Sequence, residues 1–172
     1  MSARGLGDVY KRQSLGCLTL LSHHINIIES RNFNNRAHVL VCQKSDDPKA
    51  SFIIANLYAP NANNNEKILF FEEILDAIAE FETTYECENK IVTGDFNLIF
   101  NSNEAKCRNF SAQEKNVANV VNVMIADLNL TDAMLNTTDF TWRRPNSSTF
   151  SKIERLLFSP KNHDLLSIKT NW

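Results

Sequence analysis

The stretch Lys90-Ile-Val-Thr-Gly-Asp-Phe-Asn97 decides how we interpret the rest of the chain, because it ends an apolar strand with two polar side chains. Asp95 and Asn97 are two residues apart, so on an extended backbone their side chains point the same way. Their oxygen atoms suit a hard cation or a phosphate-bound water. Gly94 lets the backbone bend or approach a ligand closely. The alternative interpretation is a strand-end turn in which Asp and Asn cap their own backbone.

The composition describes a single acidic domain. The 172 residues include 18 Lys and Arg against 20 Asp and Glu, for a net charge of −2. This length is enough for one domain with a hydrophobic core. An acidic chain binds nucleic acid only through a local basic patch. The four cysteines are far apart and form no zinc pattern, which favours reduced thiols in an intracellular protein. No apolar run approaches the ~20 residues that span a bilayer, so we expect no membrane partner.

Residues 1–13 form a separate segment. The sequence Ser2-Ala-Arg-Gly-Leu-Gly-Asp-Val-Tyr-Lys-Arg-Gln13 looks like the translation of an adaptor used to prepare sequencing libraries. We therefore expect residues 1–13 to be a disordered, adaptor-derived scar and residues 14–172 to form one partial domain. Only Gly16 and Gly94 remain outside the scar, which makes the position of Gly94 informative.

The remaining sequence alternates strands with two amphipathic helices. Runs rich in Leu, Ile and Val predict strands over residues 16–22, 25–30, 37–43, 51–58 and 91–100. Apolar residues three and four apart predict helices over residues 66–81 and 112–128, and Ser111 and Glu114 have the spacing of a capping box. Residues 138–144 and 149–158 predict a hairpin, and residues 164–172 a further strand. This order favours packed sheets under outer helices over a doubly wound parallel sheet.

Three segments place polar side chains at the end of an apolar strand. They are residues 53–61, residues 92–97, and the paired residues 140–142 and 151–155. If these strands align, one rim gathers Tyr58, Asn61, Asp95, Asn97, Thr141 and Glu154. Such a rim offers a cation site, a carboxylate that orients water, and neutral donors for phosphate oxygens. These groups are the components of metal-assisted phosphodiester hydrolysis.

Four motifs, in this order, resemble the endonuclease/exonuclease/phosphatase superfamily, and within it the apurinic-type endonuclease domain of LINE-type (non-LTR) retrotransposons. The matching residues are Asn56-Leu-Tyr-Ala-Pro-Asn61, Thr93-Gly-Asp-Phe-Asn97, Phe140-Thr-Trp142 and Ser151-Lys-Ile-Glu-Arg-Leu-Leu157. The resemblance implies an α/β fold, the DNase I-like four-layer αββα sandwich, with two packed mixed β-sheets flanked by helices. It also implies a metal-binding glutamate before this sequence and an Asp-His pair after it. We therefore expect the fold to be incomplete at its N- and C-terminal strands.

The resemblance implies roles for the residues of the rim. Asp95 would orient and deprotonate the attacking water and contact the metal. Asn97 and Tyr58 would complete the catalytic group around the phosphate, and Asn61 and Thr141 would contact the substrate. Glu154 stands at the position of a family aspartate, and its extra methylene displaces a carboxylate that we expect to bind metal.

A basic cluster lies near this rim in the sequence. It contains Arg143, Arg144, Lys152 and Arg155. We expect Arg143, Lys152 and Arg155 to bind substrate. The alternative is ordinary solvated charge on a hairpin.

The resemblance implies a fragment of an endonuclease that nicks DNA with Mg²⁺ (or Mn²⁺) and leaves a 3′-hydroxyl to prime reverse transcription. Its partners would be DNA and the reverse transcriptase domain of the same polyprotein, and its location nuclear. We expect the chain as given to be inactive, since catalytic groups that act as a unit are lost together. Two alternatives are a non-catalytic, decayed remnant and a phosphatase or sphingomyelinase-type phosphodiesterase of the same fold.

Overall fold

A large mixed sheet organises the computed structural model, which describes residues 16–47, 50–134 and 139–160. Its six strands lie in the order β1-β2-β3-β4-β9-β6. Their bounds are β1 Ile25–Phe33, β2 Ala37–Lys44, β3 Ser51–Tyr58, β4 Lys90–Asp95, β9 Glu154–Phe158 and β6 Thr131–Asp132. Strands β3 and β4 are parallel, and the other neighbours are antiparallel. The carboxyl ends of β3 and β4 therefore meet at one edge, where Tyr58 is the register partner of Asp95.

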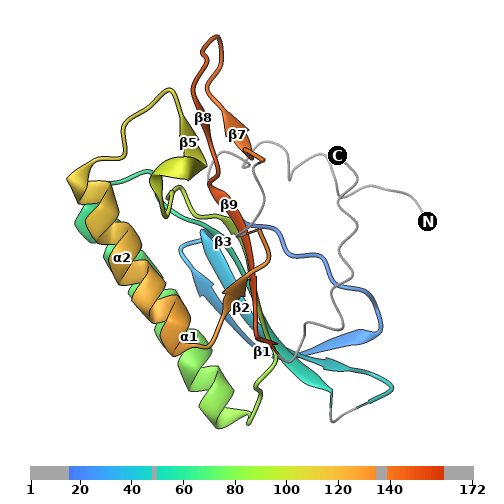
Figure 1. Ribbon diagram of the computed structural model, residues 1–172. Helices are drawn as coiled ribbons and strands as arrows, with labels where there is room; N and C mark the ends of the chain where they lie inside the picture. The colour runs from blue at the N-terminus through green and yellow to red at the C-terminus, as the bar shows by residue number, and fades with distance from the viewer. Residues whose placement is uncertain (1–15, 48–49, 135–138, 161–172) are drawn as a thin grey trace, which may run out of the picture.

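Two helices cover one face of this sheet (Figure 1). Helix α1, Asn64–Thr84, connects the parallel strands β3 and β4, as a parallel pair requires. Helix α2, Ala112–Asp127, packs beside it. The core between helices and sheet contains alternate residues of the strands and one stripe of each helix, among them Val39, Ile53, Leu57, Phe71, Ile74 and Val121. These stripes follow the periods of two and 3.6 residues on which the sequence prediction rested.

Both helices begin at a capping residue. The Asn63 side chain accepts a hydrogen bond from the Glu66 backbone N–H at 3.0 Å. Ser111 and Glu114 form the predicted capping box, in which each side chain accepts a hydrogen bond from the other residue's backbone.

A small second sheet lies beyond the end of the large one. It has the order β5-β8-β7, and its strands have two residues each: β5 Ala105–Lys106, β8 Phe150–Ser151 and β7 Trp142–Arg143. The short 3₁₀ helix η2, Ser102–Glu104, precedes β5. The chain thus has the expected mixed α/β arrangement of two sheets and helices.

Gly94 is required by the close approach of two strands. Its φ is +132°, and a Cβ atom there would lie 1.9 Å from the Leu57 carbonyl oxygen. No side chain fits at this position. We predicted that Gly94 lets the backbone bend or approach a ligand closely; the structure shows a close approach to strand β3.

Several predicted elements differ from the structure. Residues 16–22 form no strand: they form no ladder with a described strand, and the Cys17 N–H donates at 2.8 Å to the carbonyl of Asn35, in the turn between β1 and β2. The strand expected over residues 91–100 ends at Asp95. The segment expected as one strand over residues 149–158 divides into β8 and β9, which belong to different sheets.

Two further predictions lie outside the described residues: the scar over residues 1–13 and the strand over residues 164–172. In the described part of the chain, no helix combines the length and apolar character needed to cross a membrane.

Candidate functional site

A pocket of about 360 Å³ opens at the carboxyl ends of β3 and β4. It contains four residues of the expected rim, Tyr58, Asn61, Asp95 and Asn97. Its other lining residues are Lys67, Ile99, Arg108, Glu114, Trp142, Ser151 and Ile153. The parallel β3–α1–β4 unit brings the first group together, since polar residues follow both strands at the same edge.

Asp95 and Asn97 form a turn that leaves one carboxylate oxygen open. The Asn97 backbone N–H donates to Oδ1 of Asp95 at 2.8 Å, and Asn97 has a positive φ of 45°. The Asn97 side-chain amide donates to the Ala59 carbonyl at 2.7 Å. Within the described residues Oδ2 of Asp95 has no hydrogen-bond partner. The Asx turn considered from the sequence is therefore present, and it fixes Asp95 without using its second oxygen.

Asp95 and Glu154 are adjacent carboxylates. They are register partners in the antiparallel pair β4–β9, and residues directly opposite one another share a face of the sheet. Burial raises the pKa of Asp95, while the Asn97 N–H and the charge of Lys67 lower it. Burial raises the pKa of Glu154, and the charge of Asp95 raises it further. Both shifts mean that the two negative charges lack full solvation in this arrangement.

Tyr58 and Asn61 border the same pocket, and Tyr58 is the register partner of Asp95 on the neighbouring strand. The Arg36 guanidinium lies 5.3 Å from the centre of the Tyr58 ring, a cation–π contact that fixes the ring. Asn61 is exposed in the loop that follows β3. A phenol and an amide therefore border the same space as Asp95 and can donate to an anionic ligand.

Thr141 and Glu154 line a neighbouring pocket of about 430 Å³, with Met134, Asp139 and Phe140. The Thr141 hydroxyl oxygen accepts hydrogen bonds from the backbone N–H groups of Ile153 and Glu154, at 3.0 and 3.1 Å. Ile153 lines the Asp95 pocket and Glu154 the neighbouring one. The expected rim is thus divided between two pockets at the start of β9. The hydrogen bonds to Thr141 hold the backbone of Ile153 and Glu154 at the boundary between them.

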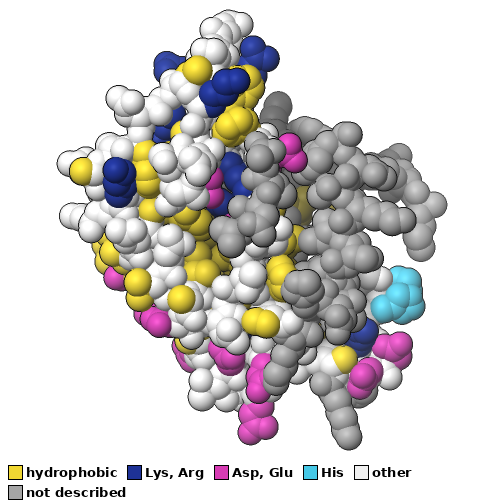
Figure 2. All heavy atoms as spheres, in the orientation of Figure 1, with side chains coloured by type: hydrophobic (Ala, Val, Ile, Leu, Met, Phe, Trp, Pro, Cys, Tyr) yellow, Lys and Arg dark blue, Asp and Glu magenta, His cyan; other side chains and the backbone are white. Residues whose placement is uncertain are grey.

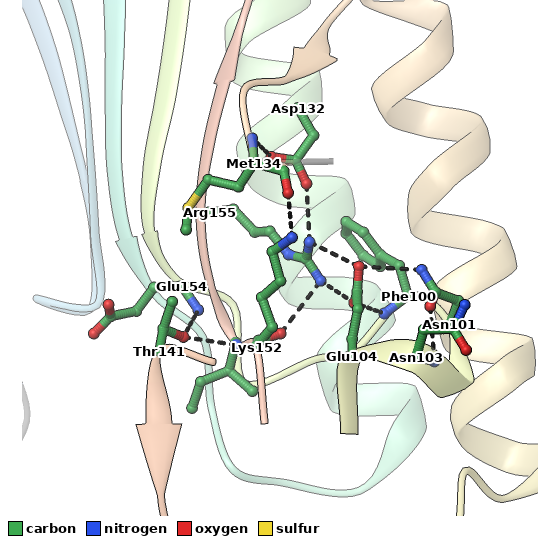
Figure 3. A network of polar contacts seen from close by, with 11 residues as sticks. Phe100, Asn101, Asn103, Glu104, Asp132, Met134, Thr141, Lys152, Glu154 and Arg155 are labelled. Atoms are coloured by element: carbon green, nitrogen blue, oxygen red, sulfur yellow. Dashed lines mark hydrogen bonds and ion pairs between the residues drawn. The ribbon is translucent and has the colours of Figure 1, made fainter. Parts of the chain in front are cut away.

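Lys152 and Arg155 differ from the expectation that they bind substrate (Figure 3). Both are 2% exposed. The Arg155 guanidinium pairs with both carboxylate oxygens of Glu104 and donates to Oδ2 of Asp132 at 2.9 Å. The guanidinium carbon, Cζ, lies 4.4 Å from the centre of the Phe100 ring. We name Glu104, Asp132, Lys152 and Arg155 the buried ionic cluster.

The buried ionic cluster connects elements that are distant in the sequence. The Lys152 ammonium donates to the Met134 carbonyl, and the Lys152 N–H donates to the Glu104 carbonyl at 2.9 Å. Glu104 also accepts from the Phe100 N–H at 2.7 Å. Burial lowers the pKa of Lys152, and the nearby Arg155 charge lowers it further. Lys152 and Arg155, which we expected to bind substrate, are therefore buried and bonded to other groups of the protein.

Arg143 and Arg144 remain on the surface, at the hairpin that includes β7 and β8. Arg143 lies 5.3 Å from the centre of the Phe150 ring and donates to the Ser147 carbonyl at 3.3 Å. In the view of Figure 2, most Lys and Arg side chains gather towards the hairpin end, and most Asp and Glu side chains lie towards the opposite end. The overall negative charge therefore coexists with a local basic region.

The sequence did not predict the other residues that line this pocket, among them the polar or aromatic side chains of Lys67, Arg108, Glu114, Trp142 and Ser151. Lys67 stands near the start of α1, six positions after Asn61, among other polar helix residues. Arg108 precedes α2 in an irregular segment. The only sequence signal for Lys67 is its proximity to the end of β3, where the polar motif residues are concentrated.

The carboxylates fit part of a divalent metal site. Carboxylate oxygens are the donors that Mg²⁺ prefers, Oδ2 of Asp95 is open, and a cation beside Asp95 and Glu154 would relieve their repulsion. Among the described residues, no group of three or more His, Cys, Asp or Glu side chains gathers as a metal-binding set. Asp95 and Glu154 would therefore supply two ligands to such an ion and no complete cage.

No protein-family model matches the chain, and no curated protein matches it. Solved structures that share its fold include an endonuclease/exonuclease/phosphatase family protein from Bacteroides thetaiotaomicron, 17% identical over 80% of this chain and 51% of that one, with a TM-score of 0.52. The endonuclease domain of TRAS1, a telomere-specific non-LTR retrotransposon, is 14% identical over 85% of this chain and 61% of that one, with a TM-score of 0.56.

The 3′ phosphatase NExo from Neisseria, bound to product DNA hairpin, is 14% identical over 81% of this chain and 59% of that one, with a TM-score of 0.53. These similarities show the fold: the chain is built as the DNase I-like endonuclease/exonuclease/phosphatase proteins are. It spans about half to three fifths of the length of these three proteins.

Proposed function

We propose that this chain carries part of the active site of a metal-dependent phosphodiester hydrolase that nicks DNA. The observation that carries the proposal is the convergence of Tyr58, Asn61, Asp95 and Asn97 on one pocket. Two neutral donors, Tyr58 and Asn61, an amide oxygen of Asn97 and a carboxylate with an open oxygen are groups that can hold a phosphate and activate a water beside it.

Asp95 is the proposed base. Its Oδ1 is fixed by the Asn97 N–H, so its Oδ2 faces a defined direction and can accept a proton from water. Its raised pKa strengthens it as a base, while its nearness to Lys67 limits the shift. Asn97 is fixed by Ala59 and bears a side-chain oxygen that can orient the same water.

Tyr58 and Asn61 are the proposed donors to the phosphate oxygens. A bound Mg²⁺ or Mn²⁺ would be held by Asp95 and Glu154 and would neutralise charge on the phosphate. Ile99 and Ile153 give the pocket an apolar part of its lining. The arrangement suits hydrolysis by positioning and charge stabilisation.

DNA is the proposed substrate for two reasons. The exposed Trp142 lines the pocket, where an indole can stack against a base. Among the proteins of the same fold, one is a retrotransposon endonuclease and another was solved with a DNA hairpin. We extend the proposal to a non-LTR retrotransposon polyprotein in the nucleus, in which the nick leaves a 3′-hydroxyl for the reverse transcriptase domain.

We also propose that the 172 residues alone hydrolyse DNA weakly or not at all. The described residues supply two carboxylates to the metal, fewer than a complete ligand set. Catalytic groups that act together are not replaceable one at a time. If the 172 residues do not hydrolyse DNA at all, the chain is the non-catalytic remnant considered from the sequence.

Nicking of supercoiled plasmid tests the proposal. The chain is expressed alone and together with the reading frame that flanks it in the source DNA, with Mg²⁺ or with EDTA. We expect Mg²⁺-dependent nicking by the longer protein, and Asp95→Asn should reduce its rate by about 10²–10⁴-fold, the usual contribution of a general base.

Equal nicking by the wild type and Asp95→Asn would contradict the catalytic assignment. A protein that hydrolyses phosphoinositides or sphingomyelin but leaves plasmid intact would show that the substrate is a small phosphodiester. Robust nicking by the 172 residues alone would refute the proposal that they are insufficient.

A further inference from the structure

Two cationic side chains border the pocket beside Asp95, and neither belongs to the hairpin. Lys67 comes from the first turns of α1, and its ammonium donates to the Asn97 carbonyl at 2.8 Å. Arg108 comes from the segment before α2. Both line the same pocket as Tyr58 and Asn97.

The charge of Lys67 is not neutralised by an ion pair. Within the described residues it has no salt bridge, and its hydrogen bond goes to a neutral carbonyl. Burial lowers its pKa, which means that the ammonium is poorly solvated. Two of its three N–H groups remain for another acceptor. The charges of Glu114 and Asp95 act on Lys67 without forming an ion pair with it, and a phosphate in the pocket would give the ammonium a charged acceptor in direct contact.

Arg108 is held by one ion pair, which leaves most of its N–H donors available. Its Nη2 pairs with Oε1 of Glu114, whose Oε2 belongs to the capping box of α2 and accepts from the Ser111 N–H at 2.9 Å. The helix end thus fixes Glu114, and Glu114 fixes one edge of the guanidinium. Since a guanidinium has five N–H donors, most of them stay available.

A buried hydroxyl at the same pocket points independently to a ligand. Ser151 is 1% exposed, and its Oγ has no hydrogen-bond partner within the described residues. Buried polar atoms are nearly always paired, so an orphan beside a pocket indicates a missing partner. An oxygen of a bound phosphate could accept this hydrogen bond.

The other basic residues near the site are less suitable. Arg155 and Lys152 are neutralised in the buried ionic cluster, and Arg143 is exposed on β7 and does not line the pocket. We infer that Lys67 and Arg108 are the substrate-binding cations of this site and that, with the Ser151 hydroxyl, they hold a DNA phosphate against Asp95. This inference rests on the proposed function.

Binding of a short, fluorescein-labelled DNA duplex by the 172-residue chain in EDTA tests the inference without hydrolysis. Fluorescence anisotropy at several salt concentrations gives the affinity and its salt dependence. Lys67→Gln and Arg108→Gln should each weaken binding about tenfold, as loss of a charge-assisted contact does. Each should also reduce the salt slope by about 0.9. Lys67→Arg should retain most of the affinity.

Lys44→Gln is the matched control, because Lys44 is an exposed lysine at the end of β2 far from the pocket in the sheet. Glu114→Gln should bind more tightly than wild type, since glutamine preserves the cap and frees Arg108. A gain of binding cannot come from misfolding.

The inference is overturned if the wild type does not bind the duplex, or if Lys67→Gln and Lys44→Gln lose affinity equally. Failure here differs from failure of the proposed function. If nicking requires Asp95 while binding ignores Lys67 and Arg108, only this inference fails. If Asp95→Asn nicks like the wild type, the catalytic proposal fails whatever the binding result.

Discussion

Asp95 and Asp132 form the same local turn in two regions of the molecule. The regions differ in whether the carboxylate is paired with a cation. Each aspartate ends a strand of the large sheet and accepts a hydrogen bond from the backbone N–H two residues later, at 2.8 Å for Asn97 and 2.7 Å for Met134. They differ in their second oxygen. Oδ2 of Asp132 meets the Arg155 guanidinium at 2.9 Å, whereas Oδ2 of Asp95 faces the pocket with no partner in the described residues.

The difference distinguishes charges that are paired inside the protein from charges that can still interact with a ligand. In the buried ionic cluster, acidic and basic groups neutralise each other, and removing one leaves the rest unpaired. Asp95 and Lys67 in the pocket, and Glu154 in the neighbouring pocket, lack complete solvation or pairing, a condition common at functional sites. An arginine next to a catalytic motif is therefore not evidence of phosphate binding until its partners are known.

Arg155→Met should have the largest effect on folding. It removes the ion-pair partner of Glu104 and Asp132 in the buried ionic cluster and leaves Lys152 as the cluster's one cation, which should lower the free energy of unfolding by about 3–5 kcal/mol. Urea unfolding measures the change. Arg143→Met, in an exposed arginine of the same sequence cluster, should stay within about 0.5 kcal/mol. Equal losses of unfolding free energy in the two variants would show that the buried and the exposed arginine contribute equally to stability, which would contradict the distinction drawn above.

Trp142→Ala should affect binding more than folding. The side chain is 41% exposed on the two-residue strand β7, so we expect a stability change within about 0.5 kcal/mol. Loss of base stacking should weaken DNA binding by about 1–3 kcal/mol. Anisotropy titration provides the test, with Val123→Ala, in an exposed residue of α2, as the control. Unchanged affinity would remove Trp142 from the substrate surface.

Glu154→Gln should alter the pH dependence of stability, the smallest of the three effects. Because the pKa values of Glu154 and Asp95 are raised above their usual 4.5 and 3.8, the folded protein binds more protons than the unfolded chain just above those values. The free energy of unfolding then falls as pH rises through the folded-state pKa values. Removing Glu154 should make this fall shallower.

Urea unfolding between about pH 3.5 and 7 covers the window in which carboxylates titrate. Glu73→Gln, in an exposed residue of α1, is the matched control. A fall that is equally steep in Glu154→Gln and wild type would show that the two carboxylates do not interact.

The sequence predicted the elements whose determinants are local. The β3–α1–β4 unit follows from periodic apolar residues, the α2 cap from Ser111 and Glu114, and the close approach at Gly94 from its place in a strand. The convergence of Tyr58, Asn61, Asp95 and Asn97 followed from strand ends that meet. These features are determined by the spacing of apolar residues, by the residues that form turns and caps, and by one pair of parallel strands.

The placement of Arg155 depends on distant partners. Glu104 precedes it by 51 residues and Asp132 by 23, and no spacing rule connects them. The interruption between β8 and β9 also breaks the strand alternation, so both Ser151 and Lys152 are buried before Ile153. The sequence did not indicate Lys67 as a site residue for a similar reason, because its pocket is formed by segments that meet only in the folded chain.

The free energies of unfolding of Asp95→Asn and Asp132→Asn, measured side by side in urea, test the central distinction most directly. Asparagine keeps the turn in both positions and removes only the charge. We predict that Asp132→Asn loses about 2 kcal/mol, since it gives up a charge-assisted bond to Arg155. Asp95→Asn should stay within about 0.5 kcal/mol of wild type or become more stable. A larger loss for Asp95→Asn than for Asp132→Asn would contradict the account, because it would make Asp95 the structural charge.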